Sequence, residues 1–380
     1  MKSSKRQHLV IFTIVFVSVL TCFAGKPLKV YILAGQSNMQ GHAKASTFEP
    51  IGMDPKTAPI LKQMTQKNGT PLVCKDVWIS SIGNNEGEQE FHGQLTTGYG
   101  AKAGGPKIGP EFTFGIYMQK IVNEPILIIK TAWGGKSLYN DFRSPSAGPF
   151  GDTPATTGKY YRLMVDHINK VLKDIKRIYP RYNSRDSFEL AGFVWFQGWN
   201  DIVNSKVYPN RNKPGGYDAY TSAMAHFIRD IRKDLSAPKI PFVIGVLGVG
   251  GPTSKYGSSQ KRYKVMHQSF RDAMAAPTKM PEFKNNVRAV LTENYWDHEL
   301  AALLERGEKV KEKSKNLNKD KNLSAKERKA KLEEFKAKLY NAREIKILTG
   351  RSNAGYHYNG SGKIMAQIGK AFAEAIKKIK

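Results

Sequence analysis

The chain has 380 residues, and its 60 Lys and Arg against 32 Asp and Glu give a formal net charge of +28. An apolar share of 40% with 11% aromatic residues excludes a wholly disordered protein. Only two cysteines are present, which excludes a disulfide scaffold and a cysteine-based zinc ribbon. The basic excess points toward acidic partners, of which nucleic acid, acidic glycans and membrane surfaces are the usual classes.

Residues 1–24 are expected to form a signal peptide. Three basic residues lie among the first six, and an apolar run from Leu9 to Leu20 follows that is short for a membrane span. Small residues at Cys22 and Ala24 suit a cut after Ala24. We therefore expect a secreted or periplasmic protein with no nucleic acid partner and no stable membrane span. An uncleaved anchor and a lipoprotein signal, with Val19-Leu20-Thr21 before Cys22, are the alternatives.

From residue 28 onward, short apolar runs alternate with longer amphipathic stretches. The apolar runs predict buried strands at Leu28–Ala34, Ile126–Ala132, Leu190–Gln197, Pro241–Gly248 and Val287–Thr292. The amphipathic stretches predict helices at Glu111–Val122, Tyr160–Ile178, Tyr217–Leu235, Ser259–Ala275 and Gly362–Ile379. This alternation predicts a three-layer α/β/α fold with a doubly wound, mainly parallel sheet, whose ligand site gathers at the carboxyl ends of the strands.

Two stretches stand outside the alternation. Ile82–Pro110 is rich in glycine and is expected to be a long loop. Glu305–Lys346 holds 15 basic and 8 acidic residues, a net charge of +7, and apolar residues recur at helical spacing in its second half. We expect one domain over residues 25–380 with a charged helical insertion at about 299–346. The insertion is either a solvated hairpin or a basic arm that contacts an acidic polymer.

A serine follows the first predicted strand directly, in Gly35-Gln36-Ser37-Asn38-Met39. Glycine permits a tight turn, and the N–H groups at the start of a following helix point toward a developing oxyanion. The segment is not Gly-x-Ser-x-Gly, so a standard α/β-hydrolase elbow is not predicted. A turn residue or a helix cap is the simpler reading of such a serine.

Three further polar motifs follow predicted strands or precede the last helix: Trp133-Gly134-Gly135, Gln197-Gly198-Trp199-Asn200-Asp201 and Tyr356-His357. A glycine pair lets backbone N–H groups approach a ligand, and an asparagine amide can donate to an oxyanion. A serine nucleophile needs a base, and histidine suits that role. Each motif alone has a simpler reading as a turn, a cap or a surface residue. Together they fall where a doubly wound sheet gathers its site.

These four blocks, in this order, resemble those of SGNH hydrolases, in the group related to sialate O-acetylesterases and family 6 carbohydrate esterases. The resemblance runs from about Leu28 to the end, apart from the basic insertion. It implies a carboxylic ester hydrolase that removes O-acetyl groups from carbohydrate, such as sialate or acetylxylan, through an acyl-enzyme.

Carried over residue by residue, the resemblance implies Ser37 as nucleophile and His357 as general base. The oxyanion would be held by the Ser37 N–H, Gly135 and the Asn200 side chain. Substrate contacts are expected from three side chains of the same blocks, namely Gln36, Gln197 and Trp133.

The acid of the triad is where the sequence departs from the resemblance. Many such hydrolases carry an acid three residues before the histidine, a position held here by Ala354. Some relatives use a glutamate in Gln-Gly-Glu, and Trp199 takes that place. Asp201 is the nearest acid in the same block and is expected to orient the histidine. Asp297, Glu293 and a dyad without an acid are the alternatives.

Three functions stay open on the residues alone: the secreted esterase, a catalytically silent glycan-binding protein on the same scaffold, and a short-chain lipase or lysophospholipase. The intact serine, asparagine and histidine favour an enzyme, and polar glycine-rich loops favour sugars over lipids. The histidines are scattered and no dinucleotide fingerprint occurs, so neither metal nor cofactor is predicted. Because most of the positive charge lies outside the insertion, we expect acetylated carbohydrate, including anionic polysaccharide, as the partner.

Overall fold

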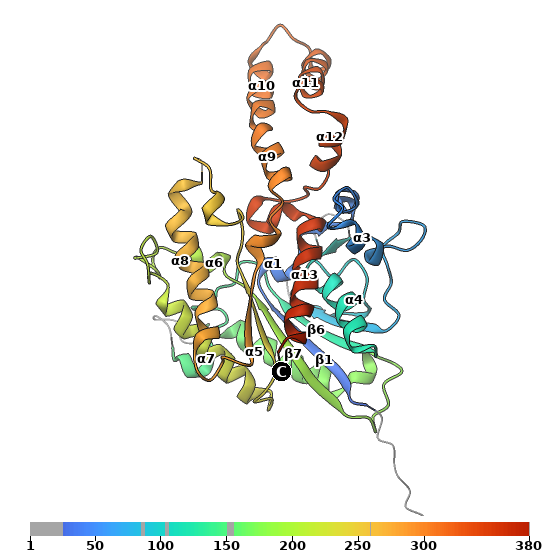
Figure 1. The fold of residues 1–380 in the computed structure, drawn as a ribbon, viewed down its shortest axis with the longest axis vertical. Helices are drawn as coiled ribbons and strands as arrows, with labels where there is room; N and C mark the ends of the chain where they lie inside the picture. Colours follow the sequence, from blue (N-terminus) through green and yellow to red (C-terminus); the bar gives the residue numbers. More distant parts are fainter. Residues whose placement is uncertain (1–25, 85–87, 103–105, 150–155, 259, 380) are drawn as a thin grey trace, which may run out of the picture.

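The computed structural model describes residues 26–84, 88–102, 106–149, 156–258 and 260–379. The predicted signal peptide lies outside these ranges. Within them, seven strands form the central sheet in the order β4-β3-β6-β1-β7-β8-β9 (Figure 1). All neighbours pair in parallel except β3 and β4. The sheet lies between helices, so the predicted α/β fold with a mainly parallel sheet is confirmed.

The five strands predicted from apolar runs are all present. They are β1 Leu28–Gly35, β6 Ile126–Ala132, β7 Phe188–Phe196, β8 Phe242–Val246 and β9 Val287–Leu291. Every residue of β6, and all of β1 except one, is buried. Because helices cover both faces of these strands, side chains on both faces are shielded from water. The strand sequences are therefore continuous apolar runs.

Two strands of the sheet were missed. β3 spans Val77–Ile82 and β4 spans Phe91–Gln94. β3 contains two buried serines, Ser80 and Ser81, whose hydroxyls bond to other side chains. These interrupt the apolar run that would have marked it. The predicted loop at Ile82–Pro110 is therefore wrong in part, since it contains β4 and the short strand β5, Lys107–Ile108, which pairs with β2, Ala43–Lys44.

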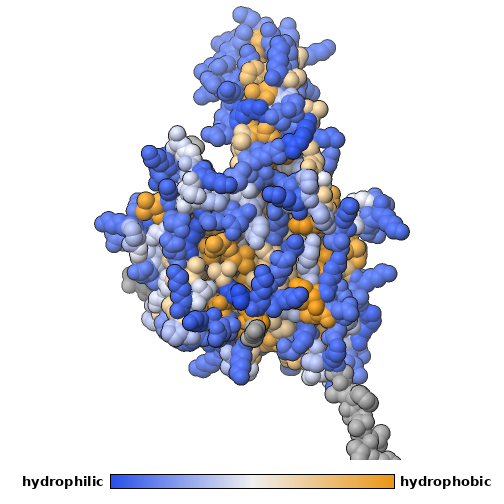
Figure 2. All heavy atoms as spheres, in the orientation of Figure 1, coloured by the Kyte–Doolittle hydropathy of each residue, from blue (hydrophilic) through white to orange (hydrophobic). Residues whose placement is uncertain are grey.

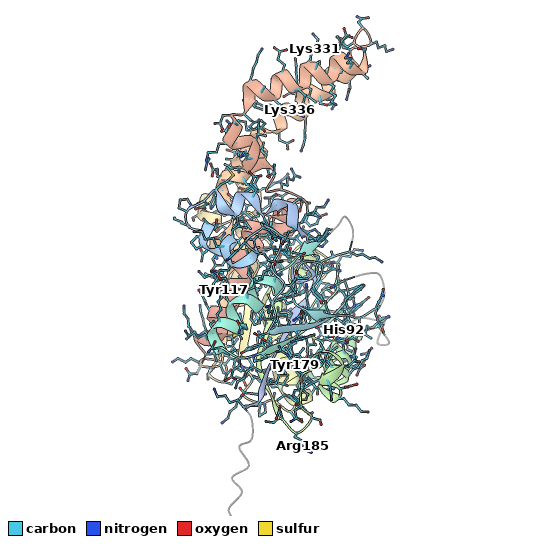
Figure 3. The ribbon with its side chains drawn as sticks, turned by 90° about the vertical axis from the view of Figure 1, so that its right-hand side faces the viewer. His92, Tyr117, Tyr179, Arg185, Lys331 and Lys336 are labelled. Atoms are coloured by element: carbon cyan, nitrogen blue, oxygen red, sulfur yellow. The ribbon has the colours of Figure 1, made fainter. Side chains whose placement is uncertain are left out.

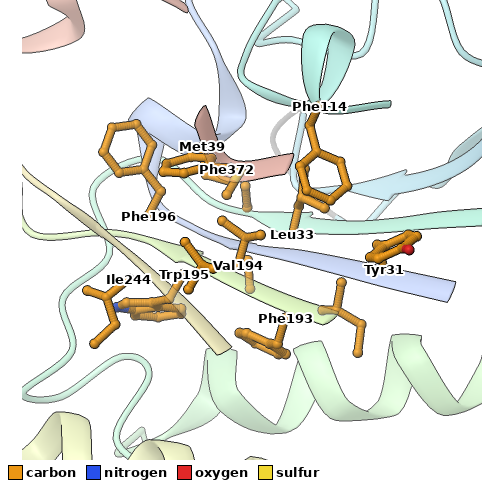
Figure 4. Packing of buried hydrophobic residues seen from close by; sticks show 14 of the residues in the cluster. Tyr31, Leu33, Met39, Phe114, Phe193, Val194, Trp195, Phe196, Ile244 and Phe372 are labelled. Atoms are coloured by element: carbon orange, nitrogen blue, oxygen red, sulfur yellow. The ribbon is translucent and has the colours of Figure 1, made fainter. Parts of the chain in front are cut away.

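The helices cover the sheet in two layers. α4 and α13 pack against each other on one face, while α5, α7 and α8 cover the other (Figure 1). Side chains of β7 alternate between these layers: Phe196 contacts Phe372 of α13, and Phe193 contacts Phe227 of α7 (Figure 4). The bounds are α1 Ser37–Gln40, α2 Glu49–Gly52, α3 Ala58–Met64, α4 Glu111–Val122, α5 Lys159–Lys173, α6 Trp199–Ile202, α7 Asp218–Asp234, α8 Lys264–Ala275 and α13 Gly362–Lys377.

The Lys/Glu-rich segment is helical along most of its length. It comprises α9 His298–Arg306, α10 Glu308–Lys319, α11 Ala325–Leu339 and α12 Ala342–Leu348. α10 and α11 form a hairpin that projects beyond the carboxyl ends of the strands, with Lys331 and Lys336 on it (Figures 1 and 3). Figure 2 shows that its surface is mainly hydrophilic. A separate small core at its base contains Leu300, Leu303, Tyr340 and Ile347.

A buried ion pair connects the sheet to the helix layer that contains α4. Lys130 of β6 and Glu111 of α4 are both fully buried, and Lys130 Nζ lies 2.7 Å from Glu111 Oε2. Nζ also donates to the carbonyls of Gln40 and Tyr99, each at 2.8 Å. Burial lowers the pKa of Lys130, and the Glu111 carboxylate opposes that shift. The ammonium therefore has three partners in place of water, and they come from three separate segments.

Breaking this pair should destabilise the fold strongly. Glu111→Gln leaves the Lys130 ammonium buried without a counter-charge, so we expect a loss of about 3–5 kcal/mol in the free energy of unfolding at neutral pH, measured by denaturant titration. The matched control is Glu282→Gln, which removes an exposed partner of Arg229 and should leave that free energy nearly unchanged. Equal unfolding midpoints for Glu111→Gln and the original protein would contradict the assignment.

Candidate active site

Ser37 stands on a tight turn between β1 and α1. A Cβ added at Gly35 would lie 2.1 Å from the carbonyl oxygen of Phe196 in β7, so no other residue fits this close approach. The Gln36 N–H donates to the same carbonyl at 3.3 Å. Ser37 is then the first residue of α1, with 7% of its surface exposed. The strand pairing of β1 with β7 thus sets the position of this hydroxyl.

His357 lies in a loop with an unusual backbone. The three residues after it, Tyr358, Asn359 and Gly360, have φ values of 50°, 59° and 56°. A bulky residue such as tyrosine rarely adopts this left-handed region. The buried Tyr358 hydroxyl holds it there, because it accepts from the Gly248 N–H at 2.7 Å and lies 2.6 Å from Thr292 Oγ1. The loop is therefore fastened to the ends of β8 and β9.

One hydrogen bond joins the serine turn to the histidine loop. Asn38 Nδ2, next to Ser37, donates to the carbonyl of Tyr356, next to His357, at 3.2 Å. The structure thus brings the two predicted catalytic segments together. Among the described residues no hydrogen bond links Ser37 Oγ to the His357 ring.

A chain of amides orients the Asn200 side chain. Gln36 Oε1 accepts from the N–H groups of Gly198 and Asn200, at 3.0 and 3.3 Å. Since backbone N–H groups can only donate, Gln36 Nε2 must face the other way, where it donates to Asn200 Oδ1 at 3.1 Å. Asn200 Nδ2 is thereby a donor, and it lies 2.9 Å from the carbonyl oxygen of Gly135.

The three predicted oxyanion donors differ in their partners. In the described part of the chain, the Ser37 N–H has no hydrogen-bond acceptor, as expected for the first residue of a helix. Asn200 Nδ2 uses one of its two hydrogens on Gly135 and has a second to offer. Gly135 is exposed and has a φ of 73°. Within the described residues, the Ser37 N–H and one hydrogen of Asn200 Nδ2 are therefore available as donors.

Asp201 does not reach the histidine. Its fully buried carboxylate accepts from four donors, the N–H groups of Leu138 and Tyr139, Gln197 Nε2 and the Tyr208 hydroxyl, at 2.6–3.2 Å. Burial raises the pKa of Asp201 to about 6, against the opposing effect of these hydrogen bonds. The expected orienting role is therefore not supported, because α6 turns this side chain toward the loop after β6.

The two alternative acids are also engaged elsewhere. Asp297 caps α9 by accepting from the Leu300 N–H at 3.1 Å and pairs with Lys363 at 3.3 Å. Glu293 forms an ion pair with Arg271. Neither has a contact with His357 among the described residues. The histidine instead faces an uncharged partner, since its Nδ1 lies 3.0 Å from Asn353 Oδ1.

A second histidine stacks on the first. The rings of His42 and His357 are parallel within 3°, with centroids 3.8 Å apart. Burial and the nearby Lys107 lower the pKa of His357 to about 4. Burial, His357, Lys107 and Lys130 lower the pKa of His42 to about 3. Both rings are therefore neutral at pH 7. Sequence reasoning missed Asn353 and His42, because neither lies at a spacing typical of a catalytic motif.

The three expected substrate-binding residues lie inside the protein. Gln36 and Gln197 are each 1% exposed, and Trp133 is 6% exposed and packs on Phe142 and Tyr160. The side-chain amides of both glutamines form hydrogen bonds within the protein. These side chains therefore position the site and offer no surface to a ligand. An exposed alternative lies beside His357, where Tyr356 and Trp199 stack at 5.8 Å.

The described residues were also compared with the requirements of a metal site and of a membrane-spanning helix. In the ranges that the structure describes, no three His, Cys, Asp or Glu side chains are placed to hold a metal ion together. No helix within those ranges has both the length and the apolar character needed to cross a bilayer.

Comparison with known proteins places the chain in a family. Residues 27–289 match the family model described as SASA, carbohydrate esterase, sialic acid-specific acetylesterase. A search of curated proteins found no match. Among solved structures, a protein of Arabidopsis thaliana is similar, with 16% identity, a TM-score of 0.41, and coverage of 70% of this chain and 86% of that one. A carbohydrate acetylesterase from Xanthomonas citri has 13% identity, a TM-score of 0.38, and coverage of 71% and 51%.

The family match spans well over half of the chain and includes the serine turn, the glycine pair and the Asn200 block. It confirms the resemblance drawn from those blocks. The protein therefore belongs to the SASA family of sialic acid-specific carbohydrate acetylesterases, which are carboxylic ester hydrolases.

Proposed function

We propose that the protein is an exported serine esterase that removes acetyl groups from carbohydrate through an acyl-enzyme, with Ser37 as nucleophile and His357 as base. The observation that carries this proposal is the hydrogen bond from Asn38 to the Tyr356 carbonyl, at 3.2 Å. It joins two segments more than 300 residues apart, one of which holds Ser37 on a turn and the other the His357 imidazole. Export rests on the N-terminal sequence alone.

In the proposed mechanism, Ser37 Oγ attacks the carbonyl carbon of the acetyl ester while His357 Nε2 takes its proton. The carbonyl oxygen becomes an oxyanion, for which the Ser37 N–H, Gly135 N–H and Asn200 Nδ2 are the proposed donors. The imidazolium then protonates the sugar oxygen, the ester bond breaks and an acetyl-serine remains. Water, deprotonated by His357, attacks that ester. The bond to Ser37 Oγ then breaks as the imidazolium returns the proton to this oxygen, and acetate is released.

The surroundings of the site favour a sugar. Tyr356, 44% exposed, and Trp199 form an aromatic surface next to His357, and such rings pack on apolar ligand faces while their polar edges stay in water. The positive charge of the chain, together with the charged hairpin on the same side of the molecule as the strand ends, favours an anionic polymer (Figure 1).

The nucleophile is tested by Ser37→Ala. This variant removes the oxygen that would carry the acetyl group, so we expect hydrolysis of an aryl acetate to fall by at least about 10³-fold, toward the residual rate left by binding and the oxyanion site. The assay follows release of the phenol. Ser269→Ala is the control and should retain activity. Ser269 lies in α8, and its hydroxyl donates to the Lys213 carbonyl. Undiminished turnover by Ser37→Ala would refute the proposal.

The oxyanion role of the amide is tested by Asn200→Ala. Loss of one preorganised donor should lower kcat by about 10²–10³-fold. The unfolding midpoint should change little, because Asn200 is only half-buried. Asn204→Ala, which removes an amide from the same region, serves as the control. A loss that appears only in KM would indicate a substrate contact instead of an oxyanion donor.

The preference for an anionic polymer is tested by salt. Long-range attraction between the basic protein and an acidic chain is screened at about 8 Å at physiological ionic strength. We therefore expect kcat/KM for acetate release from an acetylated anionic polysaccharide to fall as salt rises. The same quantity on a neutral acetylated xylan is the control and should stay nearly constant. Equal salt dependence on both polymers would mean that the charge only keeps the protein soluble.

A further inference from the structure

The uncharged partner of the histidine has a defined orientation. Asn353 Oδ1 lies 2.7 Å from the Ala354 N–H and 3.0 Å from His357 Nδ1. A backbone N–H can only donate, so the amide atom that faces it must be the oxygen. That same oxygen faces the imidazole, and it can only accept. His357 Nδ1 must therefore carry the hydrogen, which leaves Nε2 without one.

We propose that Asn353 is the positioning residue of His357 and takes the place of the missing acid: it holds the imidazole in the Nδ1–H form, with Nε2 available as the base. This inference rests on the proposed function, in which His357 is that base. The neutral amide of Asn353 lies four residues before the histidine. The position three residues before it, where many related hydrolases carry the acid, is Ala354.

The backbone around Asn353 explains how the amide is held. The N–H groups of Ser352 and Asn353 both donate to the Asn359 carbonyl, at 2.9 and 3.0 Å, and the Asn359 N–H donates to the Ala354 carbonyl at 3.1 Å. The left-handed conformation of residues 358–360 turns the Asn359 carbonyl back toward residue 353. The loop is thus closed on itself, and the amide and the imidazole lie on the same short segment.

His42 completes the arrangement from a different segment. Asn353 Nδ2, on the opposite side of the amide from His357, lies 3.5 Å from His42 Nδ1. Because Nδ2 donates, His42 Nδ1 is the acceptor in this contact. The two imidazoles therefore lie on the two ends of one amide while their rings stack at 3.8 Å. The stack fixes the plane of the His357 ring, and the amide fixes its rotation.

The charges around the pair are positive. Lys107 of β5 lies near both rings, and Lys130 of β6 acts on His42. No carboxylate among the described residues contributes to the pKa of His357. A negative charge at residue 353 would therefore be the first to face this imidazole, and it would favour the protonated ring.

The test compares Asn353→Ala, Asn353→Asp and Ser352→Ala by steady-state kinetics on an aryl acetate. The serine is the matched control: Ser352 Oγ accepts from the Lys44 N–H and lies within hydrogen-bond distance of the backbone carbonyls of His42 and Gly360, but it has no hydrogen bond to either imidazole ring. We expect Asn353→Ala to lower kcat by about 10- to 100-fold with KM little changed, part of what a general base contributes.

Asn353→Asp should keep an acceptor toward Nδ1 and so retain most of the activity. It should also move the acid limb of the kcat/KM profile to higher pH, because the new carboxylate raises the pKa of His357. Ser352→Ala should keep both kcat and the acid limb. A fall in kcat for Ser352→Ala as large as for Asn353→Ala, or an unmoved acid limb in Asn353→Asp, would overturn the positioning role.

A spectroscopic arm separates this inference from the proposed function. In protein labelled with ¹⁵N-histidine, with the His357 signals assigned from a His357→Gln variant, we expect the Nδ1–H form for the original protein and its loss in Asn353→Ala. An Nε2–H form in the original protein would overturn the inference even if the esterase is active. The Nδ1–H form in a protein without acetylesterase activity would support the positioning while the proposed function fails.

Discussion

The structure depends on keeping one buried ammonium solvated by protein atoms. Lys130 lies in the centre of the sheet, where an unpaired charge would cost several kcal/mol, so α4, the end of α1 and the segment at Tyr99 must all converge on it. That convergence fixes the C-terminal end of α1 through the Gln40 carbonyl. The N-terminal end of the same helix is fixed by the contact of Gly35 with Phe196. The serine therefore stands on a single helical turn that is held at both ends.

The site is built from amides where many hydrolases use charges. Gln36 orients Asn200, and Asn353 orients His357; in both cases a backbone N–H decides which end of the amide faces which partner. An amide in such a position is satisfied without a counter-charge, so it can be buried at a lower cost than a carboxylate. The buried carboxylate of Asp201 illustrates the contrast, since it needs four donors and supports the loop after β6 instead of the imidazole.

Much of the fold was readable from the sequence, and the reason is physical. β1, β6, β7, β8 and β9 are covered on both faces and so are marked by unbroken apolar runs, whereas β3 carries two serines bonded to side chains that only the folded chain brings near. Ser37 and Asn200 directly follow strands and were readable for that reason. Asn353 was not, because its approach to His357 depends on three successive residues with positive φ, one of them a tyrosine held by a buried hydroxyl.

In the proposed mechanism, the surroundings of the stacked histidines affect the two proton transfers of the acylation step differently. Burial and the nearby Lys107 lower the pKa of His357, and no carboxylate among the described residues opposes that shift, so the imidazole is a weak acceptor of protons and its conjugate acid is a correspondingly strong donor. In the proposed mechanism the first property slows the attack by Ser37, while the second hastens protonation of the departing sugar oxygen. A sugar alkoxide is a poor leaving group, and this arrangement gives most help where that chemistry needs it.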